Sequence, residues 1–192
     1  MPDPEPLNPL PGIRSLCVYC GSSGAVADVY REAASELGAR LAETGIEVVF
    51  GGGRVGLMGL LADAALASGG RVTGIIPGRL RDAELAHHGV SELVVVDTMH
   101  ERKALMAERA GAFAILPGGI GTLDETFEIL SWKQLGLHDK PIFLVDVDGY
   151  WSPLRTLLDR VVDRGFAQPK THDLLRVVPT VSALIELLAG SR

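Results

Sequence analysis

The chain has 192 residues, 47% of them apolar, which is enough for one folded unit with a sizeable buried core. Its formal net charge of −6 argues against a nucleic-acid partner, because such a partner is usually held by basic side chains. No apolar run is long enough to span a bilayer, so no membrane partner is expected.

The chain begins with a proline-rich segment, residues 1–12, which has no apolar stretch of the kind found in a signal peptide. We expect a disordered tail here, followed by a single nucleotide-binding domain over residues 13–192. Because no export signal is evident, we expect a cytoplasmic location.

Short strands alternate with helices along the rest of the chain. Strands are predicted at residues 14–19, 47–50, 71–76, 92–97, 112–116 and 141–145. Helices are predicted at residues 26–43, 56–67, 99–110, 122–135, 153–164 and 181–188. The strands are rich in Val, Ile and Leu rather than alternating with polar residues, as in a parallel sheet covered on both faces. The expected fold is α/β, a single doubly wound, mostly parallel sheet of Rossmann-like type with helices on both faces.

The only two cysteines, Cys17 and Cys20, have the C-x-x-C spacing of redox pairs and zinc sites. Cys17 lies inside the first strand rather than at a helix start, and no further zinc ligands follow at suitable spacing. We interpret both as small buried residues, and we expect no metal.

Three strand-to-helix junctions are rich in small residues: 21–24, 51–56 and 117–122. In a parallel sheet all three lie at the same edge, so we expect them to line one cleft. The second junction fits G-x-G-x-x-G, but no acidic residue follows the next strand to hold the ribose of a dinucleotide. The sequence also lacks a Walker-type loop, which argues against ATP hydrolysis. Tight turning alone would also explain the glycines of the second junction.

The third junction runs from Pro117 to Thr122 and reads Pro-Gly-Gly-Ile-Gly-Thr. Its glycines let a ligand approach closely, and the free N–H groups of a helix start suit an anion such as phosphate. Glu125 follows in the same helix, where it would lie beside a sugar attached to that phosphate. Asp124 points about 100° away from Glu125 on a helix, so the two carboxylates cannot both flank the same bond of a ligand, and Glu125 is expected to be the only one that acts on it. Its place near a helix start is expected to favour the ionised carboxylate.

A further group of candidate residues directly follows the fourth predicted strand, from Met99 to Lys103. Arg102 and Lys103 fall in the first turn of a helix, where positive side chains oppose the helix dipole. The planar guanidinium of Arg102 can bind a phosphate or a carboxylate in two places. Lys103 by itself would be normal on a solvated helix face, and Met99 would be normal in a core.

The chain resembles the Lonely Guy family of cytokinin riboside 5′-monophosphate phosphoribohydrolases, many of them formerly labelled lysine decarboxylases, in residues 51–59, 99–103 and 117–125. Residues 132–141 and 148–150 are also similar to that family. The resemblance implies hydrolysis of the N-glycosidic bond of a nucleoside 5′-monophosphate, such as AMP or isopentenyladenosine monophosphate. It implies that Arg102 and Glu125 are the catalytic pair, that the third junction holds the 5′-phosphate, and that the protein is a homodimer. Asp124 departs from the family pattern, in which many members have glutamate.

The candidate substrate-binding and phosphate-binding residues are Ser22, Gly52, Gly53, Met99, Lys103, Gly118, Gly119, Gly121 and Thr122. The expected partner is a small-molecule nucleotide, and no cofactor is expected. Two alternatives stay open: a non-catalytic nucleotide carrier or sensor, and a general AMP nucleosidase. A lysine decarboxylase using pyridoxal phosphate is disfavoured, because none of the four lysines has a setting typical of an aldimine.

Overall fold

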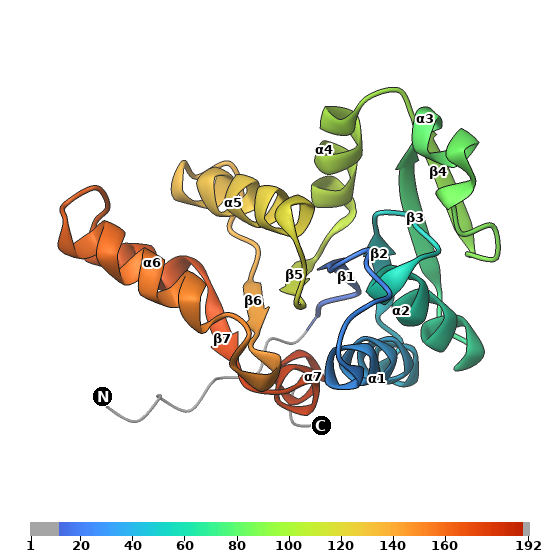
Figure 1. The fold of residues 1–192 in the computed structure, drawn as a ribbon, viewed down its shortest axis with the longest axis horizontal. Helices are drawn as coiled ribbons and strands as arrows, with labels where there is room; N and C mark the ends of the chain where they lie inside the picture. The colour runs from blue at the N-terminus through green and yellow to red at the C-terminus, as the bar shows by residue number, and fades with distance from the viewer. Residues whose placement is uncertain (1–11, 190–192) are drawn as a thin grey trace.

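The computed structural model describes residues 12–189, so the predicted proline-rich tail lies almost wholly outside the described residues. The described chain forms a seven-stranded sheet in which all neighbouring strands are parallel (Figure 1). The strands are β1 (Ser15–Tyr19), β2 (Glu47–Phe50), β3 (Val72–Pro77), β4 (Glu92–Val96), β5 (Ala112–Ile115), β6 (Ile142–Val145) and β7 (Arg176–Val178). Six of them match the predicted strands within one residue, and β7 was not predicted.

The strand order is β4-β3-β2-β1-β5-β6-β7, so the chain builds outward from β1 in both directions. Leu16 of β1 lies opposite Val48 of β2 on one side and opposite Ala112 of β5 on the other. The order of strands therefore reverses between β1 and β5, and ligands of doubly wound sheets bind at such a point. The predicted fold class is confirmed.

A helix follows each of the seven strands of the described chain. They are α1 (Asp28–Thr44), α2 (Gly56–Ala67), α3 (Gly78–Leu80), α4 (Met99–Arg109), α5 (Ile120–Gln134), α6 (Ser152–Asp163) and α7 (Val181–Ala189). Further helical segments are η1 (Arg81–Leu85), η2 (Val147–Gly149) and η3 (Pro169–Leu174). Within residues 12–189, no helix combines the length and the apolar character needed to cross a membrane.

Two hydrophobic cores lie on opposite faces of the sheet. Helices α1, α2 and α7 cover one face (Figure 1). They pack there on side chains such as Leu16 and Val18 of β1. Helices α4, α5 and α6 cover the other face, where they pack on Cys17 and Tyr19. Successive side chains of β1 thus enter different cores, which explains why its sequence shows no polar alternation.

The start of α4 is fixed by a capping box. The side chain of Thr98 accepts a hydrogen bond from the N–H of Glu101 at 3.1 Å. The Glu101 carboxylate in turn accepts from the N–H groups of Thr98 at 3.1 Å and Asp97 at 2.9 Å. Because both ends of this pair are satisfied, the first helical turn has a definite position. That turn determines where Arg102 points.

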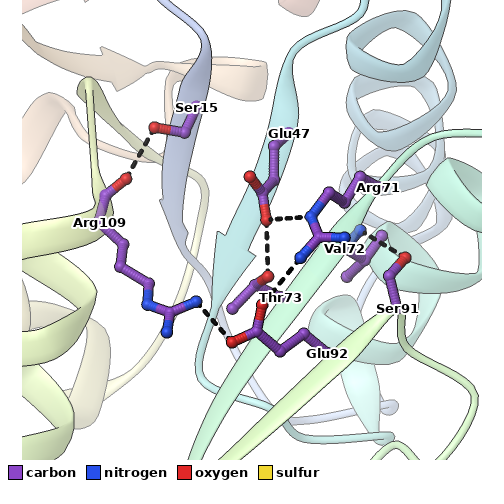
Figure 2. A network of polar contacts seen from close by, with 8 residues as sticks. All are labelled: Ser15, Glu47, Arg71, Val72, Thr73, Ser91, Glu92 and Arg109. Carbon is purple, nitrogen blue, oxygen red and sulfur yellow. Dashed lines mark hydrogen bonds and ion pairs between the residues drawn. The ribbon is translucent and has the colours of Figure 1, made fainter.

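The amino-terminal edge of the sheet carries a network of charged side chains (Figure 2). Arg71 contacts Glu47 at 3.2 Å and Glu92 at 2.8 Å. Arg109, the last residue of α4, contacts the other oxygen of Glu92 at 2.7 Å. These side chains are between about a quarter and three fifths exposed, so the network ties the starts of β2, β3 and β4 together in contact with water.

Candidate active site

A cavity of about 500 Å³ lies at the carboxyl edge of the sheet, where β2, β1 and β5 end. All three small-residue junctions contribute to its lining, so the prediction of one shared cleft is confirmed. The lining residues are Cys20, Gly21, Ser22, Gly51, Gly53, Val55, Met58, Ile76, Leu80, Leu85, Arg102, Gly119, Ile120, Gly121, Thr122 and Glu125.

The N-terminus of α5 faces this cavity without a side-chain cap. Its N-cap residue is Gly119, and no side chain accepts a hydrogen bond there. A Cβ atom at Gly119 or Gly121 would meet no atom within 4 Å, so packing does not require glycine at either position. Glycine within a helix costs about 1 kcal/mol relative to alanine. The two glycines therefore indicate a functional role, which is to leave the first N–H groups of α5 open to an anion.

Gly118 has a different role from these two glycines. A side chain at Gly118 would collide with the side chain of Thr122, which is buried beneath it. The N–H of Gly21 also donates to the carbonyl of Pro117 at 3.1 Å. Gly118 lies outside the lining of the main cavity, in an adjoining hollow. It allows the third junction to pack against β1, whereas Thr122 lines the cavity.

Arg102 and Glu125 form an ion pair at the wall of the cavity. Nη1 of Arg102 lies 3.2 Å from Oε1 of Glu125, and the two side chains are only 12% and 10% exposed. The guanidinium also donates to the carbonyls of Ile75 at 3.2 Å and Gly51 at 3.3 Å, and to the sulfur of Met99 at 3.3 Å. These contacts occupy most of the five N–H groups of an arginine. Arg102 is therefore held firmly and holds Glu125 in turn.

The Glu125 carboxyl has a pKa raised to about 7. Burial is the largest cause, the nearby Arg102 opposes it, and the negative charge of Asp124 adds to it. The expectation that the helix start would favour the ionised form is therefore wrong. Glu125 is the sixth residue of α5, where the dipole has weakened, and its side chain is only 10% exposed.

Lys103 points away from the cavity. Its Nζ contacts Asp124 at 3.0 Å and Glu128 at 3.1 Å, both on α5. Burial alone would lower the pKa of Lys103, but the hydrogen bonds that its ammonium donates to these carboxylates raise it. The alternative interpretation of Lys103 as a solvated lysine is wrong, since only 8% of the residue is exposed. Lys103 was also a candidate for substrate binding, and it does not line the cavity. The ammonium joins α4 to α5 immediately behind Glu125.

The other predicted residues fall into two groups. Ser22 and Gly53 line the cavity, whereas Gly52 and Met99 do not. Gly52 has a φ of 72° and packs closely against Ile76, so it shapes the turn after β2. Met99 reaches the site only through its sulfur contact with Arg102.

The two cysteines are buried, as predicted. Burial raises the pKa of both the Cys17 and the Cys20 thiols, which leaves them unreactive. Cys20 contributes to the cavity wall. In residues 12–189, no cluster of three or more His, Cys, Asp or Glu side chains is placed to hold a metal ion.

Sequence reasoning did not find the apolar part of the cavity wall, formed by Val55, Met58, Ile76, Leu80 and Leu85. Leu80 and Leu85 belong to the segment that leaves β3, which had no predicted structure. That segment is attached to the second junction by backbone hydrogen bonds. The only local sign of it is two leucines among polar residues directly after a strand.

Comparison with known proteins adds to this geometry. A family model described as "Possible lysine decarboxylase" matches residues 58–188. The chain is 44% identical over 175 residues to a cytokinin riboside 5′-monophosphate phosphoribohydrolase of Arabidopsis thaliana, covering 91% of this chain and 81% of the relative. It is 46% identical over 175 residues to a protein of Oryza sativa subsp. japonica named a probable cytokinin riboside 5′-monophosphate phosphoribohydrolase, covering 91% and 72%.

Among solved structures, the molybdenum cofactor carrier protein of Chlamydomonas reinhardtii has a similar fold. Its TM-score is 0.68, and the match covers 93% of this chain and 94% of that chain at 22% identity. This likeness concerns the fold alone, because one fold supports many unrelated functions.

Proposed function

Since this chain belongs to the family of cytokinin riboside 5′-monophosphate phosphoribohydrolases, we propose that it hydrolyses the N-glycosidic bond of adenosine 5′-monophosphates, with or without an N6 substituent. The products are the free base and ribose 5-phosphate. One observation carries the proposal: the buried Arg102–Glu125 pair shares a cavity with an uncapped, glycine-rich helix start. Glu125 lies five positions after Ile120 in the helix, about 7.5 Å along the axis, a spacing that a ribose 5-phosphate can bridge.

The phosphate would lie at the start of α5, where the backbone N–H groups of residues 119–121 would hold it. The hydroxyl of Ser22, which also lines the cavity, would contact the phosphate from the side of the first junction. This placement would put the sugar near Glu125. Phosphate binding there would use interactions remote from the bond that breaks, so it would position the substrate rather than activate it.

Glu125 would act on the sugar and on the attacking water. Loss of the base leaves positive charge on the ribose, and an ionised carboxylate stabilises that charge. The base departs with the bonding electrons and takes up a proton from solvent, while water adds to the sugar carbon and gives a proton to Glu125, which then releases it to solvent. A pKa of about 7 suits this role, because a general base works best near the ambient pH.

Arg102 would act through Glu125. Its guanidinium contacts Glu125 and donates hydrogen bonds to carbonyl groups near the ends of β2 and β3. Arg102 therefore holds the Glu125 carboxylate in place, and its charge lowers the pKa of Glu125 and so opposes the effect of burial. Lys103 was predicted to bind substrate, but its contacts with Asp124 and Glu128 support a positioning role instead. We propose that Lys103 holds α5 at the correct depth in the cavity.

The apolar wall bears on the choice of base. Met58, Leu80 and Leu85 come from α2 and from the segment after β3, on the side of the cavity away from the α5 start. Such a wall suits an adenine with an apolar N6 group better than it suits a bare exocyclic amine. We therefore propose a preference for N6-alkylated adenosine monophosphate over AMP.

The test is incubation with AMP and with isopentenyladenosine monophosphate, followed by chromatography of the free base. We expect base release from both, with a higher kcat/KM for the isopentenyl nucleotide. Adenosine serves as the matched substrate without phosphate, and it should react much more slowly. A tightly bound but intact nucleotide would instead indicate the carrier or sensor alternative.

We also propose a homodimer and a cytoplasmic location, as the family resemblance and the sequence led us to expect. Large apolar side chains remain exposed at the two ends of α5 and after α6, namely Ile120, Leu135, Leu137 and Phe166. A second copy could cover them. Light scattering coupled to gel filtration tests the dimer, and a mass of one chain would contradict it.

A further inference from the structure

The third junction has a polar contact that the proposed mechanism does not use. The hydroxyl of Tyr150 donates a hydrogen bond to the carbonyl of Gly118 at 2.7 Å, across 32 residues of sequence. Tyr150 follows β6 and η2, whereas Gly118 follows β5, so the contact joins two neighbouring strand ends. The two residues share the lining of a hollow of about 300 Å³ on the other side of the junction.

The backbone before Tyr150 adopts an unusual conformation to make this contact. Asp148 has a φ of 52° and ψ of 31°, the only positive φ among the non-glycine residues that the structure describes. Gly149 follows with a φ of 69°. A non-glycine residue in the left-handed region costs about 1–3 kcal/mol and persists only where its surroundings enforce it. This turn directs Tyr150 back toward the third junction.

Other contacts enforce the turn from both sides. Asp146 accepts a hydrogen bond from the N–H of Trp151 at 2.7 Å, which spans the turn. The ring of Tyr150 packs edge-on against Trp151 at 4.8 Å and against Tyr30 of α1 at 5.5 Å. The Tyr150 hydroxyl therefore has a fixed position, and the carbonyl of Gly118 is held by it.

Fixing that carbonyl also fixes the next N–H group. In a trans peptide the carbonyl of Gly118 and the N–H of Gly119 point in opposite directions, and no peptide bond in residues 12–189 is cis. With the carbonyl turned toward Tyr150, the Gly119 N–H points away from Tyr150. The main cavity lies on that side, since Gly119, Ile120 and Gly121 line it and Tyr150 does not.

We infer that Tyr150 is a positioning residue for phosphate binding: it holds the Gly118–Gly119 peptide so that the Gly119 N–H joins the start of α5 in binding the 5′-phosphate. The inference rests on the proposed function, in which a nucleoside 5′-monophosphate occupies this cavity. Without the hydroxyl, this peptide can rotate, and one phosphate donor loses its fixed direction.

The variant Tyr150→Phe tests this, because it removes the hydroxyl and leaves the ring packing in place. We expect KM for AMP and Kd for ribose 5-phosphate to rise about tenfold, the effect of losing one hydrogen bond, with kcat changed less than about twofold. Kd for adenosine, which has no phosphate, should stay the same. Tyr30→Phe is the matched control, since the described chain shows no hydrogen bond to its hydroxyl, and it should change none of these constants.

Two results would overturn the inference: unchanged affinity for ribose 5-phosphate in Tyr150→Phe, or equal losses for ribose 5-phosphate and adenosine. Thermal unfolding within a few degrees of the parent shows that the variant is folded. The proposed function fails separately, if the parent releases no base from either nucleotide. Ribose 5-phosphate binding then still decides the role of Tyr150, and a parent that binds no ribose 5-phosphate contradicts both proposals.

Discussion

The same pair of residue types, arginine and glutamate, occurs at opposite edges of the sheet with opposite effects on the carboxyl. At the carboxyl edge, Glu125 contacts Arg102 in a buried site and its pKa is raised to about 7. At the amino edge, Glu92 contacts Arg109 and Arg71 in water, and its pKa is lowered, chiefly by the hydrogen bond from Arg109 (Figure 2). Partner identity is thus a poor guide to the charge state of a carboxyl group.

Loss of water explains the difference. An arginine stabilises a neighbouring carboxylate in both places, but burial penalises the charge of Glu125 by more than Arg102 returns. At the amino edge, water already solvates the charge, so the arginines add only a modest preference for ionisation. The first pair is suited to proton transfer at neutral pH, and the second is suited to tying strands together.

The largest expected effect is on turnover in the variant Glu125→Gln. Its amide keeps the shape but cannot stabilise a cationic sugar or accept a proton. We expect kcat to fall at least about 10²–10³-fold, as for other single electrostatic contacts in active sites. The measurement is base release under saturating nucleotide, with binding of ribose 5-phosphate as the check on folding. Turnover within tenfold of the parent would remove Glu125 from the mechanism.

The pH dependence of the parent enzyme sharpens the comparison. Since Glu125 must be ionised to act and its pKa is about 7, kcat/KM should fall about tenfold per unit as the pH drops below 7. A substrate phosphate also titrates near this range, so inhibition by ribose 5-phosphate over the same pH values serves as the control. An acidic limb centred below pH 5 would show that Glu125 behaves like an exposed carboxyl.

Stability should respond to pH in the sense set by the raised pKa. Between the ordinary glutamate pKa of 4.5 and about 7, the unfolded chain ionises Glu125 while the folded chain keeps its proton. The parent therefore loses stability as pH rises through this window. The free energy of unfolding of Glu125→Gln, measured relative to that of the parent, should therefore rise by roughly 3 kcal/mol between pH 4 and pH 8, at 1.36 kcal/mol per pKa unit. Denaturant unfolding at the two pH values measures it, and a constant difference would contradict the assignment.

Removal of Lys103 should have a smaller effect that reaches the chemistry through Glu125. Lys103→Met keeps much of the buried stem but leaves Asp124 and Glu128 without their shared cation. Because the charge of Lys103 lowers the pKa of Glu125, its loss should move the acidic limb of kcat/KM to higher pH. We expect a several-fold loss of activity at pH 7 and partial recovery at pH 8. Lys103→Arg should keep the limb in place, whereas an unmoved limb in Lys103→Met would argue for direct substrate contact.

The smallest expected effect is at the amino edge. Glu92→Gln should leave turnover and its pH dependence unchanged, because Glu92 lies at the opposite edge of the sheet from the cavity. The lowered pKa means that any stability due to Glu92 is present above the unfolded pKa and fades as pH falls. Thermal unfolding of the parent and of Glu92→Gln should therefore show a small destabilisation of the variant at pH 7 that fades at pH 4, opposite in direction to the trend expected for Glu125. A marked change in turnover would mean that the two edges are coupled.

The sequence allowed the sheet, its long helices and the convergence of three junctions to be predicted, because each depends on local patterns. Glycine-rich turns directly after apolar strands at residues 47–50 and 112–116 place their loops at one edge in any parallel sheet. The strand β7 escaped prediction because its three residues, Arg176–Val178, are too few to show a period.

What could not be predicted depends on contacts between distant segments. Lys103 looks like a surface residue until α5 brings Asp124 and Glu128 against it. The pKa of Glu125 depends on how much water the assembled walls exclude, which no local pattern records. The contact of Tyr150 with Gly118 likewise joins two loops that are neighbours only because β5 and β6 pair.

The central position of β1 has a consequence for the order in which the protein folds. Leu16 pairs with Val48 and with Ala112, so one side of β1 can close early, but the other must wait for a segment almost a hundred residues later. Long-range pairing of this kind is slow, because a large loop must close before any contact forms. The cavity needs both sides of β1 and therefore forms late. A nucleotide that binds only the finished cavity would stabilise the state formed in the last folding step. During refolding, nucleotide binding would then recover later than the helix signal.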